Sequence, residues 1–195
     1  MANLIINSIY KHKQIQEQIR RSFYENSPPS ITLHKFLTEQ AINQIKNETT
    51  KASYKRQFDT LKYSYSIAKI TKNTQILLDS QELLHFLKIL SPSITKIPEG
   101  YFIELNHQDY SLLHDEKNHK EKTNHCFDLI IDLSDNWPDE AGGKIVYTKS
   151  DGEALFVPAS TNTLTLVSRA GFGRYIEYCN HKAKKNKRKF ILVEI

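Results

Sequence analysis

The second half of the chain alternates short apolar runs with turn residues, and this pattern constrains the fold more than any other feature. The runs that can form strands cover 101–106, 110–114, 125–133, 143–148, 153–157, 162–168, 174–179 and 189–195. Turn signals separate them, among them Gly142 followed by Gly143, and Ser150, Asp151 and Gly152. Many short strands at this spacing predict an antiparallel sandwich or barrel.

The first 99 residues have a different texture, with helical periodicity and capping residues. The expected elements are helices at 9–24, 38–46 and 80–90, strands at 30–36 and 61–70, and a polar loop or frayed helix at 47–58. The sequence contains no internal repeat and no flexible linker. We therefore expect one α+β, mainly β domain over 1–195, with a helical or mixed layer (1–99) packed on one side of a β core (100–195).

The composition is that of an ordinary globular chain. Its 195 residues are 39% hydrophobic and 25% charged. No run of 18 apolar residues predicts a membrane span, and the first residues lack the pattern of a secretory signal. Two cysteines, Cys126 and Cys179, form no disulfide framework, and both are expected to be small buried hydrophobes within strands. A cytoplasmic location is the simplest prediction.

The formal net charge of +5 has a local origin. Six basic residues fall within 182–189, and without them the chain is close to neutral. Lysine clusters can bind phosphates without reading a base sequence, so nucleic-acid binding is one interpretation. The segment has few aromatic residues for stacking, however, and a solvated loop between two strands explains it more simply. Nucleic acid is therefore an unlikely partner.

A possible metal-binding pair lies at the end of the run 110–114. His114 and Glu116 are two residues apart, and residues i and i+2 of an extended strand point to the same face. A His and a carboxylate from one strand, with a second His from elsewhere, make the metal-binding triad of non-haem iron oxygenases. The spacing is also common by chance, so a solvated strand end is the alternative interpretation.

The order of features around this pair resembles the iron(II)- and 2-oxoglutarate-dependent oxygenases, specifically their prolyl-hydroxylase-like branch. The features are Phe36 and Leu37 after Pro28 and Pro29, the run 109–116, the apolar strand 127–133, Trp137, Gly142 and Gly143, Pro158, and Asn162 with Thr163. The resemblance implies a double-stranded β-helix core of the jelly-roll or cupin type, with N-terminal helices packed on one side. It also implies Fe(II) and 2-oxoglutarate as cofactors, and a peptide, protein or amino-acid substrate that is hydroxylated.

The resemblance assigns roles to individual residues. His114 matches the first iron ligand, and Glu116 matches the carboxylate ligand, where the family normally has Asp. Arg188 matches the basic residue that grips the far carboxylate of 2-oxoglutarate. An arginine suits that role because its planar fork can hold a carboxylate through two parallel hydrogen bonds. The alternative is that Arg188 simply closes the basic loop.

The family's distal histidine falls on Arg174, which is the candidate catalytic-site residue of this chain. A guanidinium stays protonated and has no free lone pair, so it cannot replace imidazole as an ordinary ligand. His181, His125 or His119 could supply the third ligand only if the register differs. Two functions therefore remain open: an oxygenase with an atypical metal site, or an inactive binding module in which Arg174 pairs with Glu116.

Overall fold

The computed structural model describes residues 5–112 and 126–195. The helices are α1 (Lys13–Glu25), α2 (Glu39–Lys51), α3 (Lys72–Leu78) and α4 (Gln81–Leu90), with 3-10 helices at Ser8–Lys11, Asp139–Ala141 and His181–Ala183. The strands are β1 (Ser30–His34), β2 (Lys55–Asp59), β3 (Tyr63–Lys69), β4 (Tyr101–Leu105), β5 (Tyr110–Ser111), β6 (Phe127–Asp132), β7 (Ile145–Thr148), β8 (Ala154–Val157), β9 (Thr163–Ser168), β10 (Gly173–Ile176) and β11 (Arg188–Glu194). No described helix is long and apolar enough to cross a membrane.

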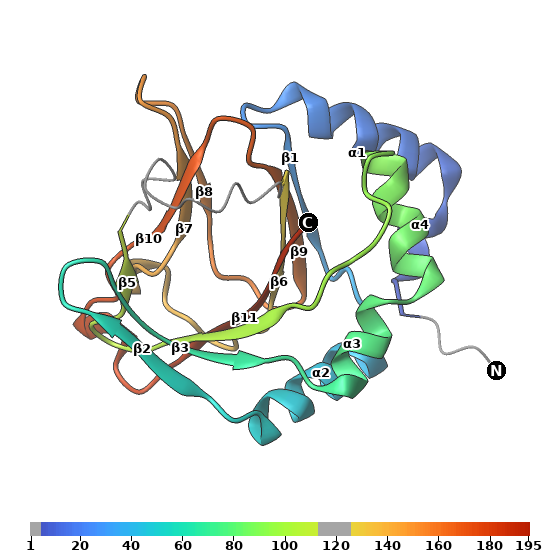
Figure 1. The fold of residues 1–195 in the computed structure, drawn as a ribbon. Helices are drawn as coiled ribbons and strands as arrows, with labels where there is room; N and C mark the ends of the chain where they lie inside the picture. The colour runs from blue at the N-terminus through green and yellow to red at the C-terminus, as the bar shows by residue number, and fades with distance from the viewer. Residues whose placement is uncertain (1–4, 113–125) are drawn as a thin grey trace.

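The strands form one antiparallel sheet that curls back on itself (Figure 1). Its order is β1-β9-β6-β11-β4-β3-β5-β10-β7-β8, and β2 pairs with β3 outside this path. One wall of the curl contains β4, β11, β6 and β9, and the other contains β5, β10, β7 and β8. This arrangement confirms the α+β, double-stranded β-helix fold that the sequence resemblance implied.

Along the strands of the first wall, successive side chains point to opposite faces of the sheet, and the two faces pack in different cores. On β6, Leu129 and Ile131 point outward and join the core formed with the helices, whereas Ile130 points into the barrel. On β11, Ile191 points outward and Phe190 inward in the same way. The helices α1 and α4 lie side by side over the outer face of this wall (Figure 1). The inward-facing side chains therefore form a separate core inside the barrel.

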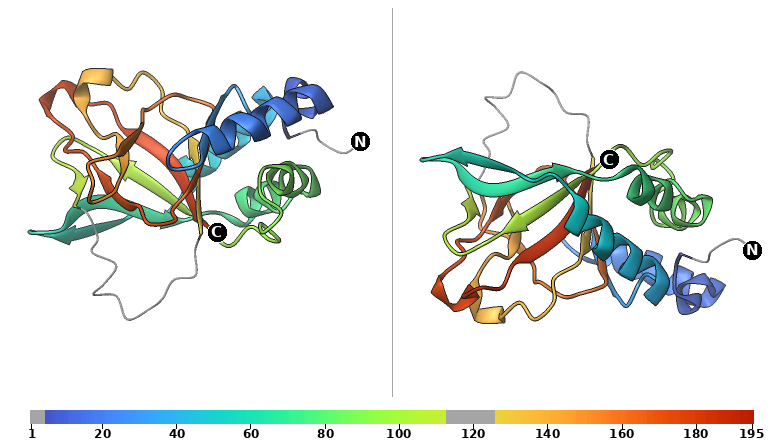
Figure 2. Two further views of the ribbon diagram at one scale, coloured as in Figure 1. Left: turned by 90° about the horizontal axis from the view of Figure 1, so that it is seen from above. Right: turned by 90° about the horizontal axis from the view of Figure 1, so that it is seen from below.

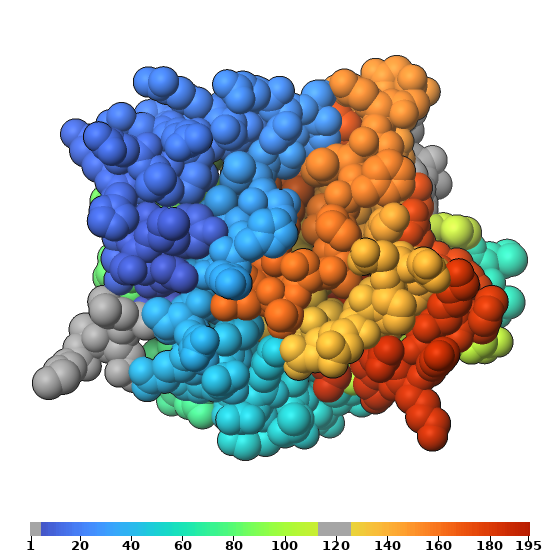
Figure 3. All heavy atoms as spheres, turned by 180° about the vertical axis from the view of Figure 1, so that it is seen from behind, coloured from blue at the N-terminus to red at the C-terminus, as the bar shows by residue number. Residues whose placement is uncertain are grey.

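The first 99 residues contribute strands as well as helices. β3 lies between β4 and β5, and β1 extends the other end of the order beside β9. Seen from behind, the N-terminal quarter of the chain lies against the segment around β8 and β9 (Figure 3), as the β1–β9 pairing requires. The β2–β3 hairpin extends beyond the barrel in both views of Figure 2.

Most elements lie where the sequence predicted them, with two corrections. The segment 47–58 is not a loop, because α2 continues to Lys51 and β2 follows it. Pairing with β3 explains why these polar residues are extended, and tertiary pairing of this kind is invisible to local periodicity. In addition, Cys126 is exposed, and neither it nor the buried Cys179 lies within a strand.

The turn at Gly142 and Gly143 needs glycine for both conformational and steric reasons. Both residues have positive φ, at 74° and 73°. A Cβ on Gly142 would lie 2.2 Å from the Tyr178 carbonyl oxygen, which no side chain could tolerate. This predicted turn therefore brings the chain between β6 and β7 against the segment after β10, at one end of the barrel.

Candidate ligand site in the barrel

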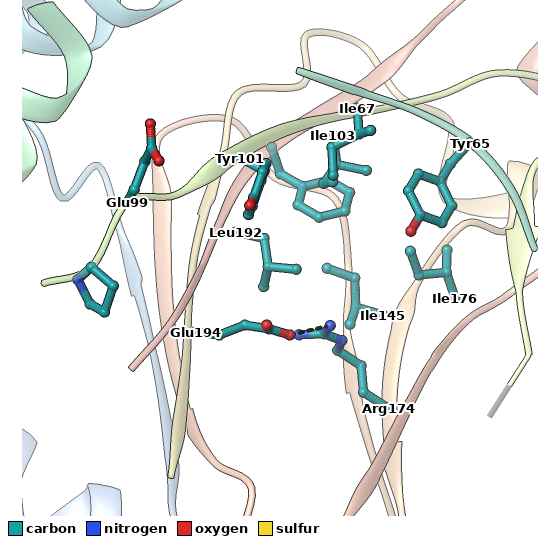
Figure 4. A pocket seen from close by; sticks show the side chains of 12 residues that line it. Tyr65, Ile67, Glu99, Tyr101, Ile103, Ile145, Arg174, Ile176, Leu192 and Glu194 are labelled. Carbon is teal, nitrogen blue, oxygen red and sulfur yellow. Dashed lines mark hydrogen bonds and ion pairs between the residues drawn. The ribbon is translucent and has the colours of Figure 1, made fainter. Parts of the chain in front are cut away.

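The barrel interior contains a pocket of about 340 Å³. Its walls are mostly apolar or aromatic, and charged groups lie at its floor and rim (Figure 4). The lining residues are Tyr65, Ile67, Pro98, Glu99, Tyr101, Ile103, Ile145, Arg174, Ile176, Phe190, Leu192 and Glu194. This volume lies at the lower end of the roughly 300–1,000 Å³ that is usual for small-molecule sites.

Strand alternation explains which residues reach the pocket. On β11, Phe190, Leu192 and Glu194 occupy alternate positions and share the inward face. On β10, Arg174 and Ile176 do the same, opposite their partners on β7. The sequence patterns that built the barrel therefore also place one carboxylate and one guanidinium at the pocket floor.

Arg174 is held by two carboxylates. Its Nη1 donates to Asp128 Oδ2 at 2.7 Å, and its Nη2 donates to Glu194 Oε1 at 2.8 Å. Arg169 stands behind the same two carboxylates, at 3.8 Å from Asp128 and 3.7 Å from Glu194. Two guanidinium groups and two carboxylates thus form a compact network without net charge, which we call the floor network.

A buried tyrosine completes the floor network. The Tyr147 hydroxyl donates to Asp128 Oδ2 at 2.7 Å, and both side chains are fully enclosed. Burial and the charge of Asp128 raise the pKa of Tyr147 well above its ordinary value, so the hydroxyl stays a donor. Burial alone would lower the pKa of Arg174, but the charges of Asp128 and Glu194 raise it above its ordinary value.

Arg188 lies at the opposite end of the barrel interior and is fully buried. Its Nε and Nη2 donate to Asp132 Oδ2 at 3.3 and 3.1 Å, Nη2 also reaches the Val157 carbonyl, and Nη1 donates to the Gly143 carbonyl. Arg188 is therefore inward-facing, as the resemblance to a cosubstrate anchor implied. Its fork is engaged by a carboxylate of the chain itself.

The predicted metal pair cannot be placed. His114 and Glu116 lie outside the described residues, as do His119 and His125. His181 is described, and its side chain is exposed. Within 5–112 and 126–195, no three His, Cys, Asp or Glu side chains are grouped as a metal site would require.

Sequence reasoning missed the partners of both arginines. Asp128 and Asp132 are four residues apart in an otherwise apolar strand, so they share the inward face of β6. A carboxylate in a buried strand needs a cation or several donors, because an unpaired buried charge is very costly. That rule, applied to 127–133, predicts that both aspartates have buried partners, although it does not identify Arg174 and Arg188.

Much of the basic segment 182–189 is neutralised within the chain. Lys182 pairs with Glu140 at 2.7 Å, and Lys187 and Lys189 lie 2.8 and 3.4 Å from Glu104. Arg188 points into the barrel. Because Lys187 and Lys189 share the single charge of Glu104, three of the six positive charges are matched by carboxylates. This halves the excess charge that suggested a phosphate contact and supports the interpretation of a solvated loop.

Known proteins resemble this chain in structure, whereas the comparisons of its sequence found no match. No protein-family profile and no curated protein matches the sequence. An oxidoreductase of the 2OG-Fe(II) oxygenase family from Burkholderia pseudomallei superposes with a TM-score of 0.74 at 10% identity, over 91% of this chain and 89% of that one. The chain has the fold of the iron(II)- and 2-oxoglutarate-dependent oxygenases.

Two prolyl hydroxylases are also similar to this oxygenase-fold chain. One, from Pseudomonas putida, is a prolyl-4-hydroxylase with a TM-score of 0.66 at 10% identity, over 92% of this chain and 97% of that one. The other, from Trichoplax adhaerens, was solved with a peptide fragment of the hypoxia-inducible-factor oxygen degradation domain. It has a TM-score of 0.67 at 10% identity, over 95% of this chain and 90% of that one.

The described residues do not fit the two cofactors that oxygenases of this fold use. Arg174 stands where the sequence resemblance puts a metal-binding histidine, and a protonated guanidinium offers no lone pair. Its positive charge would also repel a divalent cation beside it. Arg188 stands where the sequence resemblance puts the residue that grips the cosubstrate carboxylate. Its guanidinium, however, already binds the Asp132 carboxylate. Among the described residues, this part of the barrel therefore offers charged and hydrogen-bonding groups but no grouped metal ligands.

Proposed function

We propose that this chain is a non-catalytic ligand-binding module on the oxygenase fold, in which the floor network replaces the metal centre. The observation that carries the proposal is the position of Arg174, between Asp128 and Glu194 at 2.7 and 2.8 Å. A pocket of about 340 Å³ opens directly above this pair. The pocket offers apolar walls to a ligand, and the floor offers charged groups to orient it.

The charge arrangement supports binding over catalysis. The floor network is neutral in itself, so it needs no metal ion to balance Asp128 and Glu194. Arg188 and Asp132 likewise balance each other at the other end. Each buried charge of the interior therefore has a permanent protein partner, which is how a barrel of this kind can be stable without a cofactor.

An iron(II)- and 2-oxoglutarate-dependent hydroxylase is the second candidate, acting on a peptide or amino-acid side chain. The spacing of His114 and Glu116 favours it, and the peptide bound by the T. adhaerens enzyme suggests the substrate class by resemblance. This candidate requires a third metal ligand from elsewhere in the chain. It also requires Arg188 to exchange Asp132 for the cosubstrate.

Metal titration separates the two candidates. We expect the purified wild-type chain to bind no stoichiometric Mn²⁺ or anaerobic Fe²⁺ by calorimetry and elemental analysis, and to consume no 2-oxoglutarate. The variant R174H removes the guanidinium and supplies an imidazole at the position that the family uses for its distal ligand. It is therefore expected to gain Mn²⁺ binding, whereas the matched control R174Q is not.

The opposite result would reverse the proposal. One Mn²⁺ bound per wild-type chain, lost on H114A and accompanied by 2-oxoglutarate consumption, would identify the chain as an oxygenase. Binding in R174H but in neither the wild type nor R174Q would assign the loss of metal binding to the missing imidazole, because R174Q also removes the guanidinium.

A further inference from the structure

The polar groups that line the barrel pocket restrict the kind of ligand it can hold. The walls are mostly isoleucine, leucine and phenylalanine, and the charged lining residues are Glu99, Arg174 and Glu194. Glu99 is largely exposed and pairs with Lys69 at 3.1 Å, so it belongs to the rim. The charged groups that a buried ligand would meet are therefore Arg174 and Glu194, joined in Figure 4 by a dashed line.

Arg174 and Glu194 offer the pocket a donor and an acceptor side by side. Neither side chain is fully enclosed, since 20% of Arg174 and 38% of Glu194 are exposed. The guanidinium has more N–H groups than the two that donate to Asp128 and Glu194, and a carboxylate oxygen can accept more than one hydrogen bond. A ligand can therefore bond to both residues while their own hydrogen bond stays intact.

The same pair disfavours a charged ligand of either sign. An anion placed on it would be attracted by Arg174 and repelled by Glu194, and a cation would meet the reverse. A charged ligand would also lose much more hydration between apolar walls than an uncharged one. An uncharged amide loses less, and it can donate to Glu194 and accept from Arg174 at the same time. The pair therefore suits an uncharged polar group.

Tyr65 adds an uncharged hydrogen-bonding group from another wall. It lies on β3, and Figure 4 shows its hydroxyl directed into the pocket. Within 5–112 and 126–195, this hydroxyl forms no hydrogen bond. Burial raises the pKa of Tyr65, and the charges of Arg174 and Glu194 also act on it. The hydroxyl therefore stays protonated at neutral pH, within electrostatic range of the pair, and can donate to a ligand.

We propose that the pocket binds an uncharged small molecule that has an apolar body and an amide group. The amide N–H would donate to Glu194, and the amide carbonyl would accept from Arg174 and Tyr65. The apolar body would occupy the walls, and the volume of about 340 Å³ is that of a small-molecule site. This ligand class rests on the proposed function and specifies its ligand.

Four probes built on the same six-carbon chain test this class by NMR titration of the full-length protein at neutral pH. Hexanamide donates and accepts, N,N-dimethylhexanamide only accepts, and hexanoate and hexylamine are charged. We expect hexanamide to bind about fivefold or more tightly than each of the others, as one net hydrogen bond would give. Hexanoate or hexylamine binding as tightly as hexanamide, or no binding by any probe, would overturn the proposal.

E194Q tests the charged pair through the ratio of hexanoate affinity to hexanamide affinity. It removes the charge that repels an anion, so this ratio should rise several-fold. Because Glu194 is partly exposed, the variant is expected to fold. E153Q is the matched control, since it alters a partly exposed carboxylate that pairs with Lys149 at 3.2 Å outside the pocket. A ratio that is the same in E194Q, E153Q and the wild type would contradict the proposed site.

Y65F tests the hydroxyl and keeps the aromatic ring. Loss of one hydrogen bond is expected to weaken hexanamide binding about fivefold. Y178F removes an exposed tyrosine hydroxyl outside the pocket and should leave the affinity unchanged. Equal hexanamide affinity in Y65F and Y178F would contradict a contact between Tyr65 and the ligand.

Failure of the ligand class and failure of the proposed function give different results. Equal binding of the charged and uncharged probes, without Mn²⁺ binding, would refute the amide class and leave the module intact. One Mn²⁺ bound per wild-type chain and lost on H114A would refute the module itself, whichever probe binds.

Discussion

The two inward arginines of the barrel are similar in chemistry and different in enclosure. Arg188 is fully buried, and its donors reach Asp132 and two backbone carbonyls. Arg174 faces a pocket, with one buried partner, Asp128, and one half-exposed partner, Glu194. The closed end, at Arg188, therefore keeps its ion pair wholly inside the protein, whereas the open end, at Arg174, has one partner that water can reach.

Each arginine is matched by an aspartate on β6, and these aspartates face inward from the two ends of the same strand. The closed end could be replaced by apolar residues with little loss, as buried ion pairs often can. The open end differs, because water screens the pairing of Arg174 with the partly exposed Glu194.

The largest expected effect comes from breaking the closed pair. R188M leaves Asp132 buried without a cation, and we expect it to lower the free energy of unfolding by about 3–5 kcal/mol. Chemical denaturation monitored by circular dichroism measures the loss. The double variant R188M/D132L removes both charges and is expected to recover much of it.

R174M is the matched control at the open end. Asp128 keeps the Tyr147 hydroxyl at 2.7 Å and Arg169 at 3.8 Å, so we expect a smaller cost of about 1–3 kcal/mol. Equal losses of unfolding free energy in R188M and R174M would mean that the two arginines contribute equally to stability despite their different burial.

The sequence predicted the barrel well because its signals are local. Turn residues such as Gly142 and Asp151 and period-two apolar runs delimit the strands of the second half. Capping residues predicted the helix starts in the same way. The Ser80 side chain accepts a hydrogen bond from the Leu83 amide, as expected of a cap. What failed was β2, a polar strand that owes its conformation to pairing with β3.

The site was harder to predict because its partners are distant in sequence. The 114–116 pair came from its spacing and the role of Arg174 from resemblance, and the expected partner of Arg174 was Glu116. Among the described residues its partners are Asp128 and Glu194, 46 and 20 residues away. No periodicity encodes such pairings, and a rule on buried charges would have predicted only that partners exist.

A second prediction concerns the open end at alkaline pH. Burial and then Asp128 raise the pKa of Tyr147, so the unfolded chain releases this proton near pH 10 while the folded chain retains it. Stability is therefore fully present below pH 10 and falls above it, by about 1.4 kcal/mol per pH unit from Tyr147 alone. Denaturation curves at pH 8.5 and 10.5 measure the slope.

Y147F isolates this contribution. Burial also raises the pKa values of Tyr54 and Tyr65, so part of the alkaline loss should remain in the variant. A slope that is the same in the wild type and in Y147F would show that the hydroxyl ionises freely and does not hold Asp128.

The smallest expected loss of stability concerns the two partners of Arg174, Glu194 and Asp128. E194Q removes the charge of a half-exposed carboxylate whose pairing with Arg174 is screened by water, so it should cost less than about 1 kcal/mol. D128N changes the enclosed partner of the same arginine and should cost clearly more. Thermal unfolding of both variants at low and high salt gives the measurement. If E194Q were as damaging as D128N, the two partners of Arg174 would contribute equally to stability despite their different burial.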